Sequence, residues 1–327
     1  MSFIFVKPST LSTSSVTPST GRSKRDLWLI LISFAITYFV WGSTYLANWW
    51  AVHAIPPFLL AGARFTFAGL FMYVLGMAFG QARVTRQHWR NAFFAGFMLF
   101  VMGNGALVWA LQYIDSGIVA LIVAFEPLLV VILQWKMKAR KPGLLTIGGI
   151  FLGVVGMALL VGQPEFAGDR NWIAAMVVIL FGMIAWAYIS VWLTDADMPN
   201  SVFQAAAMQM ISGGAVLLVI AVFTGDYMKF NPGAVPEKAW WSVLYLIIGG
   251  SVVAFTAFNY LIKKVSTEKA VTNTYVNPVV ALFLGWWLNS EKITGQSIVA
   301  SVLLLGGVFL INARMLIPKK ATEPTGA

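Results

Sequence analysis

Residues 114–135 read IDSGIVALIVAFEPLLVVILQW, a stretch whose only charged side chains are Asp115 near its start and Glu126 near its middle. An α-helix rises about 1.5 Å per residue, so a stretch of this length can cross the roughly 30 Å hydrocarbon core of a bilayer. Similar charge-poor runs recur along the chain, with short loops between them. The sequence therefore predicts an all-α integral membrane protein with ten transmembrane helices, near Leu27–Ala47, Pro57–Phe79, Asn91–Leu111, Ile114–Trp135, Gly143–Gly162, Trp172–Leu193, Ser201–Thr224, Ala239–Ile262, Ala270–Asn289 and Gly295–Met315.

The composition of the whole chain agrees with this fold class. Of its 327 residues, 59% are hydrophobic and 10% are charged, whereas about a quarter of the residues in a soluble domain are charged. The chain has no cysteine, which excludes disulfides and thiolate metal sites, and its two histidines, His53 and His88, fall in loops on opposite sides of the membrane. We therefore expect no metal, no cofactor and no enzymatic activity, because an intramembrane enzyme needs an acid–base or metal constellation inside its spans.

The net charge of +10 follows the membrane topology and does not indicate a nucleic-acid partner. Most of the 22 Lys and Arg residues fall on the side of the membrane that holds the amino terminus. The positive-inside rule then predicts that both termini are cytoplasmic. Residues 1–26 are rich in Ser, Thr and Pro and lack an apolar run, so we interpret them as a disordered tail.

The two halves of the chain resemble each other. A shift of 145 residues places Trp41 on Trp186, and a shift of 151 places Glu126-Pro127 on Asn277-Pro278. Each half has an odd number of spans, so the second half runs through the membrane in the opposite direction, an arrangement typical of alternating-access transporters. The predicted organisation is a cytoplasmic tail over 1–26, a five-span repeat over 27–162, an inverted five-span repeat over 172–315 and a cytoplasmic tail over 316–327.

These residues resemble the EamA-type branch of the drug/metabolite transporter superfamily. The resemblance rests on WGSTY at 41–45, PFLLAGAR at 57–64, Glu126-Pro127, Asn277-Pro278 and LNSE at 288–291. It implies ten spans in two inverted repeats and a bacterial inner-membrane exporter of amino acids or other metabolites. The chain departs from the family pattern at Arg140, the repeat mate of Glu291, where such chains often carry an acidic residue.

Two ionisable residues lie deep inside predicted spans, Arg64 in the second and Glu126 in the fourth. A charge in hydrocarbon costs about 2.5 to 3.5 kcal/mol, so each of them needs a partner or a water-filled cavity. Either the two side chains neutralise each other in a salt bridge, or they face the transport cavity. In the second case Arg64 would bind a substrate carboxylate, and Glu126 a substrate ammonium group or a coupling proton.

Other polar and aromatic side chains inside the spans are candidates for lining the same cavity. The predicted substrate-binding set is Trp41, Thr44, Arg64, Asn104, Glu126, Trp186, Asn259, Tyr260, Asn273 and Asn277. Asn273 and Asn277 are four residues apart, so they share one face of a helix. The alternatives are hydrogen bonds between helices for the amides and ordinary packing for the aromatic rings.

Pro127 and Pro278 occupy equivalent places in the two halves, and each removes one helical hydrogen bond. We expect both helices to bend there and to serve as hinges, with an inert kink as the alternative. Glycines in the fifth and tenth spans, among them Gly149 and Gly307, predict close helix packing without a role in transport.

The function that these features favour is secondary active transport, with export of small metabolites such as amino acids by alternating access. An exporter of drugs or cationic compounds is the alternative within the same class. A passive channel is disfavoured because channels usually form from rings of identical segments. The expected partners are a small-molecule substrate, the lipid bilayer and, as a candidate coupling ion, the proton, while the substrate, the coupling mode and the oligomeric state stay open.

Overall fold

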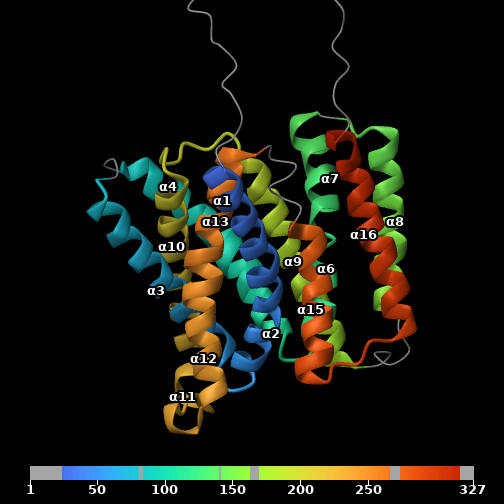
Figure 1. The fold of residues 1–327 in the computed structure, drawn as a ribbon. Coiled ribbons are helices and arrows are strands. Elements are labelled where there is room, and N and C mark those ends of the chain that lie inside the picture. Colours follow the sequence, from blue (N-terminus) through green and yellow to red (C-terminus); the bar gives the residue numbers. More distant parts are fainter. Residues whose placement is uncertain (1–23, 81–83, 140, 163–168, 266–272, 317–327) are drawn as a thin grey trace, which may run out of the picture.

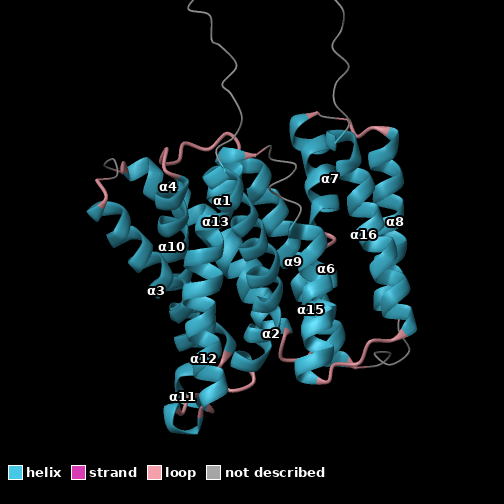
Figure 2. Cartoon of the chain, viewed as in Figure 1, coloured by secondary structure: helices cyan, strands magenta, loops and turns pink. Residues whose placement is uncertain are grey.

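The computed structural model describes residues 24–80, 84–139, 141–162, 169–265 and 273–316. Within these ranges every regular element is a helix, and no strand occurs (Figures 1 and 2). The first helix begins at Lys24, three residues before the predicted start of the first span. The rest of the predicted amino-terminal tail, the carboxy-terminal tail from residue 317 and Arg140 lie outside the described residues.

The first half of the chain forms the helices that precede residue 163. Three of its spans contain more than one helical segment. The elements are α1 (Lys24–Ala35), the π-helix η1 (Ile36–Val40), α2 (Trp41–Val52), α3 (Pro57–Ala78), α4 (Arg86–Gly96), the π-helix η2 (Phe97–Gly105), α5 (Ala106–Ala110), α6 (Ser116–Val123), α7 (Glu126–Lys138) and α8 (Leu144–Val161).

The second half begins at α9, and it too has a span that changes its winding. Its elements are α9 (Arg170–Trp192), α10 (Val202–Phe223), α11 (Asp226–Lys229), the 3₁₀ turn η4 (Pro232–Ala234), α12 (Glu237–Tyr245), the π-helix η5 (Leu246–Val253), α13 (Ala254–Lys264), α15 (Asn273–Asn289) and α16 (Gly295–Leu316).

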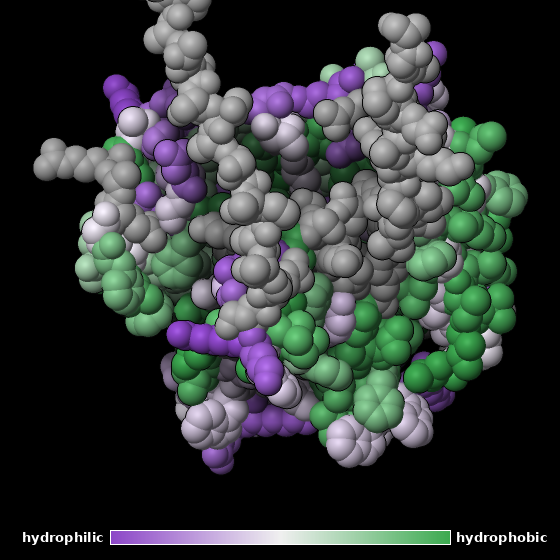
Figure 3. All heavy atoms as spheres, turned by 45° about the horizontal axis from the view of Figure 1, so that its top comes forward, coloured by the Kyte–Doolittle hydropathy of each residue, from purple (hydrophilic) through white to green (hydrophobic). Residues whose placement is uncertain are grey.

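Seven helices in the described ranges are long and apolar enough to cross a membrane: Lys24–Val52, Pro57–Ala78, Arg86–Ala110, Ser116–Lys138, Arg170–Trp192, Val202–Phe223 and Glu237–Phe258. Three shorter apolar helices coincide with the predicted fifth, ninth and tenth spans, at Leu144–Leu160, Val276–Asn289 and Gly295–Ile311. The side of the molecule that carries α8 and α16 is an almost continuous hydrophobic surface (Figure 3). The chain is therefore an all-α, multi-pass membrane protein, and the count of ten spans stays a prediction.

Several helices begin where a short polar side chain satisfies the free N–H groups of the first turn. Thr85 accepts from the N–H of His88 at the start of α4, and Ser201 accepts from the N–H of Gln204 at the start of α10. At the start of α9, Asp169 accepts from the N–H groups of Asn171 and Trp172. These caps fix the helix ends in the loops between spans.

Small residues let two helix pairs approach closely. A Cβ atom at Gly69 of α3 would lie 2.8 Å from the backbone nitrogen of Ile211 in α10, and one at Gly307 of α16 would lie 2.6 Å from the carbonyl oxygen of Gly149 in α8. Each pair joins one helix from each predicted half. The predicted close packing of the fifth and tenth spans is confirmed, and the α8–α16 pair stands at the opposite side of the molecule from α3, α4 and α10 (Figure 1).

The two proline sites differ from each other. The span that contains Pro127 is interrupted, because α6 ends at Val123 and α7 begins at Glu126. Proline is tolerated in the first turn of a helix, so α7 starts there without strain. By contrast, α15 continues through Pro278 without interruption. Only the first of the two expected hinge sites therefore coincides with a break in the helix.

The ends of α7 and α15 share an uncommon backbone conformation. Ala139 and Ser290 both have φ of 53°, and they are the non-glycine residues with positive φ in the described ranges. They are separated by the same shift of 151 residues that places Glu126-Pro127 on Asn277-Pro278.

Candidate functional site

Arg64 lies in α3 and is only 7% exposed. Its Nε donates to Ser251 Oγ at 3.2 Å, and its Nη1 donates to Asn48 Oδ1 at 3.2 Å. Its guanidinium carbon lies 4.7 Å from the centre of the Phe65 ring. The guanidinium is therefore held between α2, α3 and η5, by residues from both halves of the chain.

The residues around Arg64 are fixed by bonds to backbone carbonyls. The Asn48 amide donates to the carbonyl of Thr44 at 2.7 Å, and the Thr44 hydroxyl donates to the carbonyl of Trp41 at 2.6 Å. The indole of Trp41 donates to the carbonyl of Gly250 at 3.0 Å, which joins α2 to η5. Trp41, Thr44 and Arg64 are three of the predicted site residues, and the structure brings them together in one cluster.

Ser251 is a member of this cluster that sequence reasoning missed. Its hydroxyl donates to the carbonyl of Leu246, five residues back, at 3.0 Å. This spacing belongs to a π-helix, so the local widening of η5 positions the hydroxyl that accepts from Arg64. A Cβ atom at Gly250 would lie 3.2 Å from Nη2 of Arg64, so the glycine leaves room for the guanidinium. The available signal was one serine following two glycines in an apolar run.

No carboxylate pairs with Arg64 among the described residues. The ion pairs between described residues involve neither Arg64 nor Glu126. The salt bridge between Arg64 and Glu126, one of the two predicted alternatives, is therefore not formed. A buried charge without a counter-charge is unfavourable in an apolar surrounding. Arg64 can therefore bind a carboxylate that enters from outside the protein.

Glu126 lies at the interruption of its span, where a turn at Ala124-Phe125 separates α6 from α7. Its side chain is half-buried and forms no hydrogen bond or ion pair with another described residue. Tyr45 of α2 lies close enough to interact with it electrostatically. Glu126 is the first residue of α7, directly after this turn. It is thus available to a cation or a proton.

Asn273 and Asn277 of α15 are both buried and share one face, as predicted. With its amide nitrogen facing them, Asn277 donates to the carbonyls of Thr37, Tyr38 and Asn273 at 3.1 to 3.2 Å. Thr37 and Tyr38 belong to η1, so Asn277 ties α15 to the first span. In this conformation Asn277 forms hydrogen bonds between helices, which was the alternative to lining the transport cavity.

Asn104 and Trp186 form a separate contact between η2 and α9. The Asn104 amide donates to the carbonyl of Leu99 at 3.3 Å, again five residues back along a π-helix. Trp186 packs on the neighbouring Gly103, where a Cβ atom would lie 2.6 Å from the indole ring. In the described part of the structure, Asn104 thus bonds to a backbone carbonyl and Trp186 packs on a neighbouring helix.

Tyr260 lies apart from Arg64, near the start of α1. Its hydroxyl bonds to Asp26 Oδ1 at 3.5 Å, and Lys264, which donates to the same oxygen at 3.2 Å, lies 5.8 Å from its ring. This predicted site residue therefore belongs to a polar contact between α1 and α13. The side chain of Asn259, another predicted site residue, lies outside the described part of the structure.

Glu291 contacts the start of α6, a role that sequence reasoning missed. Its carboxylate accepts from the N–H groups of Ser116 and Gly117 at 3.1 and 3.0 Å and from the Ser116 hydroxyl at 2.7 Å. The amide of Asn289 donates to it at 3.2 Å. A Cβ atom at Gly285 would lie 2.3 Å from Oε2, so this glycine makes room for the carboxylate. The sequence showed Glu291 only as part of a family motif.

A second carboxylate from the second half caps a helix of the first. Asp226, which is 4% exposed, accepts from the N–H of Phe58 at 3.1 Å, in the first turn of α3. Helix α3 begins with Pro57 and has no cap of its own. The starts of α3 and α6 are therefore both completed by acidic side chains from distant parts of the chain.

Asp115 stands directly before α6, in the loop outside the spans. Burial, and then the nearby carboxylate of Glu291, raise the pKa of Asp115 from 3.8 to about 6, while the neighbouring His53 opposes this shift. The loop between α5 and α6 thus contains a carboxyl group that titrates closer to neutral pH than an ordinary aspartate.

Comparison with known proteins gives a family match over most of the chain. The model of the EamA-like transporter family matches residues 27–162 and again residues 173–313. The uncharacterized inner membrane transporter YedA of Escherichia coli K12 is 32% identical over 306 residues, which cover 90% of this chain and 96% of that protein.

More distant proteins are similar over nearly the same length. The uncharacterized transporter YoaV of Bacillus subtilis is 21% identical and covers 86% of this chain, with 96% of YoaV matched. A chloroplastic WAT1-related protein of Arabidopsis thaliana is 27% identical over 87% of this chain and 69% of its own length. A solved crystal structure with 20% sequence identity superposes with a TM-score of 0.60 over 89% of this chain and 97% of the other, which shows a shared fold.

Proposed function

Because this chain belongs to the EamA-like transporter family, we propose that it is a secondary active transporter that exports small metabolites, such as amino acids, by alternating access. In this proposal it is a multi-pass protein of the bacterial inner membrane, and both of its termini are cytoplasmic. The two five-span halves rock against each other about a site near the middle of the bilayer. The matched positions of Ala139 and Ser290 support two halves with a common backbone plan.

The observation that carries the proposal is the cluster around Arg64. This guanidinium is buried, has no carboxylate partner in the described residues, and is held by Asn48 from the first half and Ser251 from the second. A substrate carboxylate would supply the missing counter-charge through charge-assisted hydrogen bonds. Because the cluster joins the two halves, a relative motion of the halves changes the contacts of Arg64, which couples substrate binding to access.

Glu126 is the proposed site for the positive partner. Its carboxylate has no described protein partner and stands at the α6–α7 break, where the chain is not held by continuous helical hydrogen bonds. It accepts either the ammonium group of the substrate or a coupling proton. The same feature favours a second candidate function, export of cationic compounds, in which Glu126 binds the substrate and Arg64 has a structural role.

Transport into proteoliposomes tests the proposal. The substrate is a panel of labelled amino acids, with and without a pH gradient, and the proteins are the wild type, Arg64→Ala and Glu126→Gln. We expect Arg64→Ala to lower uptake at limiting substrate by at least tenfold, because a charge-assisted hydrogen bond contributes about 1.5 to 3 kcal/mol. Glu126→Gln should abolish only the component driven by the gradient if the proton binds there.

Matched variants separate these effects from general damage. Arg170→Gln and Glu237→Gln make similar changes on exposed residues at the starts of α9 and α12, and both should transport like the wild type. If no amino acid moves while the protein remains folded, the amino-acid proposal is overturned. Uptake of a cationic panel that depends on Glu126 but not on Arg64 would then support the second candidate.

A further inference from the structure

An open hollow of about 620 Å³ lies between α4 and α10. It is lined by Arg86, Gln87, Trp89, Arg90, Phe93 and Ser212. Helices α3, α4 and α10 stand together at one edge of the molecule (Figure 1). The hollow is separate from the Arg64 cluster, and none of its lining residues belongs to the predicted substrate-binding set.

The upper end of the hollow carries two arginines that lack a counter-charge. Arg86 and Arg90 are both exposed, and neither forms an ion pair with a described residue. They lie four residues apart, so their like charges repel each other on one helix face. They also occupy the first turns of α4, where the helix dipole is already positive and no acidic residue is present. An anion bound between them would supply the missing counter-charge, offset the repulsion between the two arginines and interact favourably with the positive end of the helix dipole.

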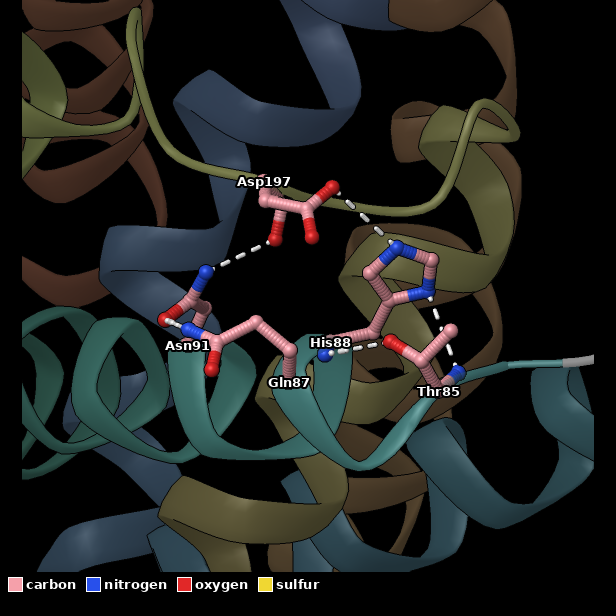
Figure 4. A network of polar contacts seen from close by, with 5 residues as sticks. All are labelled: Thr85, Gln87, His88, Asn91 and Asp197. Carbon is pink, nitrogen blue, oxygen red and sulfur yellow. Dashed lines mark hydrogen bonds and ion pairs between the residues drawn. The ribbon is translucent and has the colours of Figure 1, made fainter.

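The opposite face of α4 is anchored to the protein, which fixes the direction in which the arginines point. His88 contacts Asp197 at 3.3 Å, and Asn91 donates to the carbonyl of Asp197 at 2.8 Å. Figure 4 shows these contacts together with Thr85, whose hydroxyl caps the helix, and Gln87, whose amide donates to Asn91 at 2.8 Å. The acidic side chain nearest to α4 in this network is therefore engaged by His88 and does not neutralise the arginines.

The lower end of the hollow is apolar. Phe93, two turns along the helix from Arg86, is 52% exposed. The Trp89 ring lies 5.6 Å from the ring of Tyr73 in α3, an amphipathic pair of the kind that sits at the membrane–water boundary. Ser212 donates its hydroxyl to the carbonyl of Met208 at 2.8 Å, so its own polar group is already satisfied.

Direct contact between the two helices closes the hollow below Phe93. A Cβ atom at Gly96 of α4 would lie 2.4 Å from the carbonyl of Gln209, and one at Gly213 of α10 would lie 2.5 Å from the carbonyl of Gly96. The hollow is thus a wedge with a cationic mouth at the helix start and an apolar floor toward the middle of the membrane. From Arg86 to Phe93 it extends about 10 Å along the helix axis.

We propose that this wedge binds an anionic phospholipid, with the phosphodiester between Arg86 and Arg90 and the start of an acyl chain against Phe93. A cationic mouth at the membrane surface matches an anionic headgroup, and basic pockets between transmembrane helices bind such lipids. A zwitterionic lipid fits less well, because its ammonium group would face the same two arginines. The proposal requires only that the start of α4 lies at a membrane surface, so it does not depend on the transported substrate.

A lipid titration tests the proposal. Purified, delipidated protein in detergent is titrated with dioleoyl phosphatidylglycerol and, separately, with dioleoyl phosphatidylcholine, and the apparent Kd is measured without substrate or gradient. We expect the wild type to prefer phosphatidylglycerol and the double variant R86Q/R90Q to bind it about 30-fold more weakly, since each basic residue near an anionic surface contributes on the order of a fivefold change. Arg170→Gln, which removes one exposed arginine elsewhere, should bind like the wild type.

Two further comparisons identify the ligand. Phe93→Gln retains both arginines and should weaken binding of the dioleoyl lipid more than that of its dihexanoyl analogue. Glycerol phosphate should not compete at the same concentration, whereas competition by it would indicate a soluble phosphate ligand and overturn the lipid proposal. Equal binding of the wild type and folded R86Q/R90Q would also overturn it. Neither result would bear on amino-acid transport, which is measured independently.

Discussion

Glu291 completes the start of a helix that lies 175 residues earlier in the chain. Its buried carboxylate accepts from two backbone N–H groups and a hydroxyl at the positive end of α6. Glu291→Gln places an amide nitrogen against these donors and removes the charge. We expect the free energy of unfolding to fall by about 3 kcal/mol, and the apparent melting temperature in detergent to fall by about 5 to 10 °C.

The matched control for this change is Glu237→Gln. Glu237 accepts from the Trp241 indole at 2.9 Å on an exposed face of α12. An exposed contact of this kind contributes less than about 1 kcal/mol. If the two variants melt at the same temperature, Glu291 does not hold α6 in the way described.

Asp115 is predicted to make the stability of the folded protein depend on pH. Its pKa is raised to about 6 by burial and by the carboxylate of Glu291, so the folded protein binds this proton more tightly than the unfolded chain does. The stabilising contribution of the protonated group is complete below pH 3.8 and is lost as the pH rises through 6. Asp115→Asn, which resembles the protonated form, should melt like the wild type near pH 4 and at a higher temperature above pH 6.

This pH dependence is measured by melting both proteins in detergent from pH 4 to pH 8. Asp169→Asn serves as the comparison, because Asp169 is an exposed cap of α9 and asparagine caps helices about as well as aspartate, so this variant should melt like the wild type. A constant difference between wild type and Asp115→Asn across the whole range would contradict the raised pKa.

At the level of single residues, the sequence alone identified side chains whose charge is unusual inside a predicted membrane span. Arg64 and Glu126 are charged residues inside apolar runs, so they could be recognised without a structure. Ser251 and Glu291 could not be assigned their roles, because a serine in a span and a glutamate at a loop are individually ordinary. Their importance comes from partners 187 and 175 residues away, which no local pattern reveals.

At the scale of elements, substitutions at two adjacent glycines of α16 should have different effects on stability. A Cβ atom at Gly307 would lie 2.6 Å from the carbonyl of Gly149 and 2.9 Å from the nitrogen of Gly153, whereas one at Gly306 would meet nothing within 4 Å. Because the obstacles at Gly307 are backbone atoms, the helices must separate. We expect Gly307→Ala to destabilise the protein by about 1 to 3 kcal/mol.

Gly306→Ala is the control, since it makes the same change one residue away. Alanine has a higher helix propensity than glycine by up to about 1 kcal/mol, so this variant should be as stable as the wild type or slightly more stable. Thermal melting in detergent measures both. Equal destabilisation of the two variants would show that α8 and α16 are not in close contact at Gly307.

The sequence was informative about where helices lie and less so about their internal geometry. Hydropathy alone located the apolar runs, because each must cover the same thickness of hydrocarbon. The π-helical segments η1, η2 and η5 were not predicted, since their widening depends on tertiary contacts and not on a residue type. The prolines show the same limit. Pro127 lies at a helix break and Pro278 inside a continuous helix, although both have the same local signature.

For the whole molecule, the composition established the class of protein, and the weak internal similarity predicted two related halves. What could not be read from the sequence is how closely the halves interlock. Arg64 bonds to Ser251, Asp226 caps α3 and Glu291 caps α6, so each contact joins one half to the other. Such contacts follow from the packing of all the helices and are specified by no single segment.

The pairing of α8 with α16 has a consequence for how the protein is made. α8 packs chiefly against α16, which is synthesised after the other helices that the structure describes. At about 5 to 20 residues per second, translation of the intervening chain takes on the order of ten seconds. During that time the segment that packs on Gly149 has not yet been made. The packing of α8 against α16 must therefore wait until α16 has been synthesised and inserted.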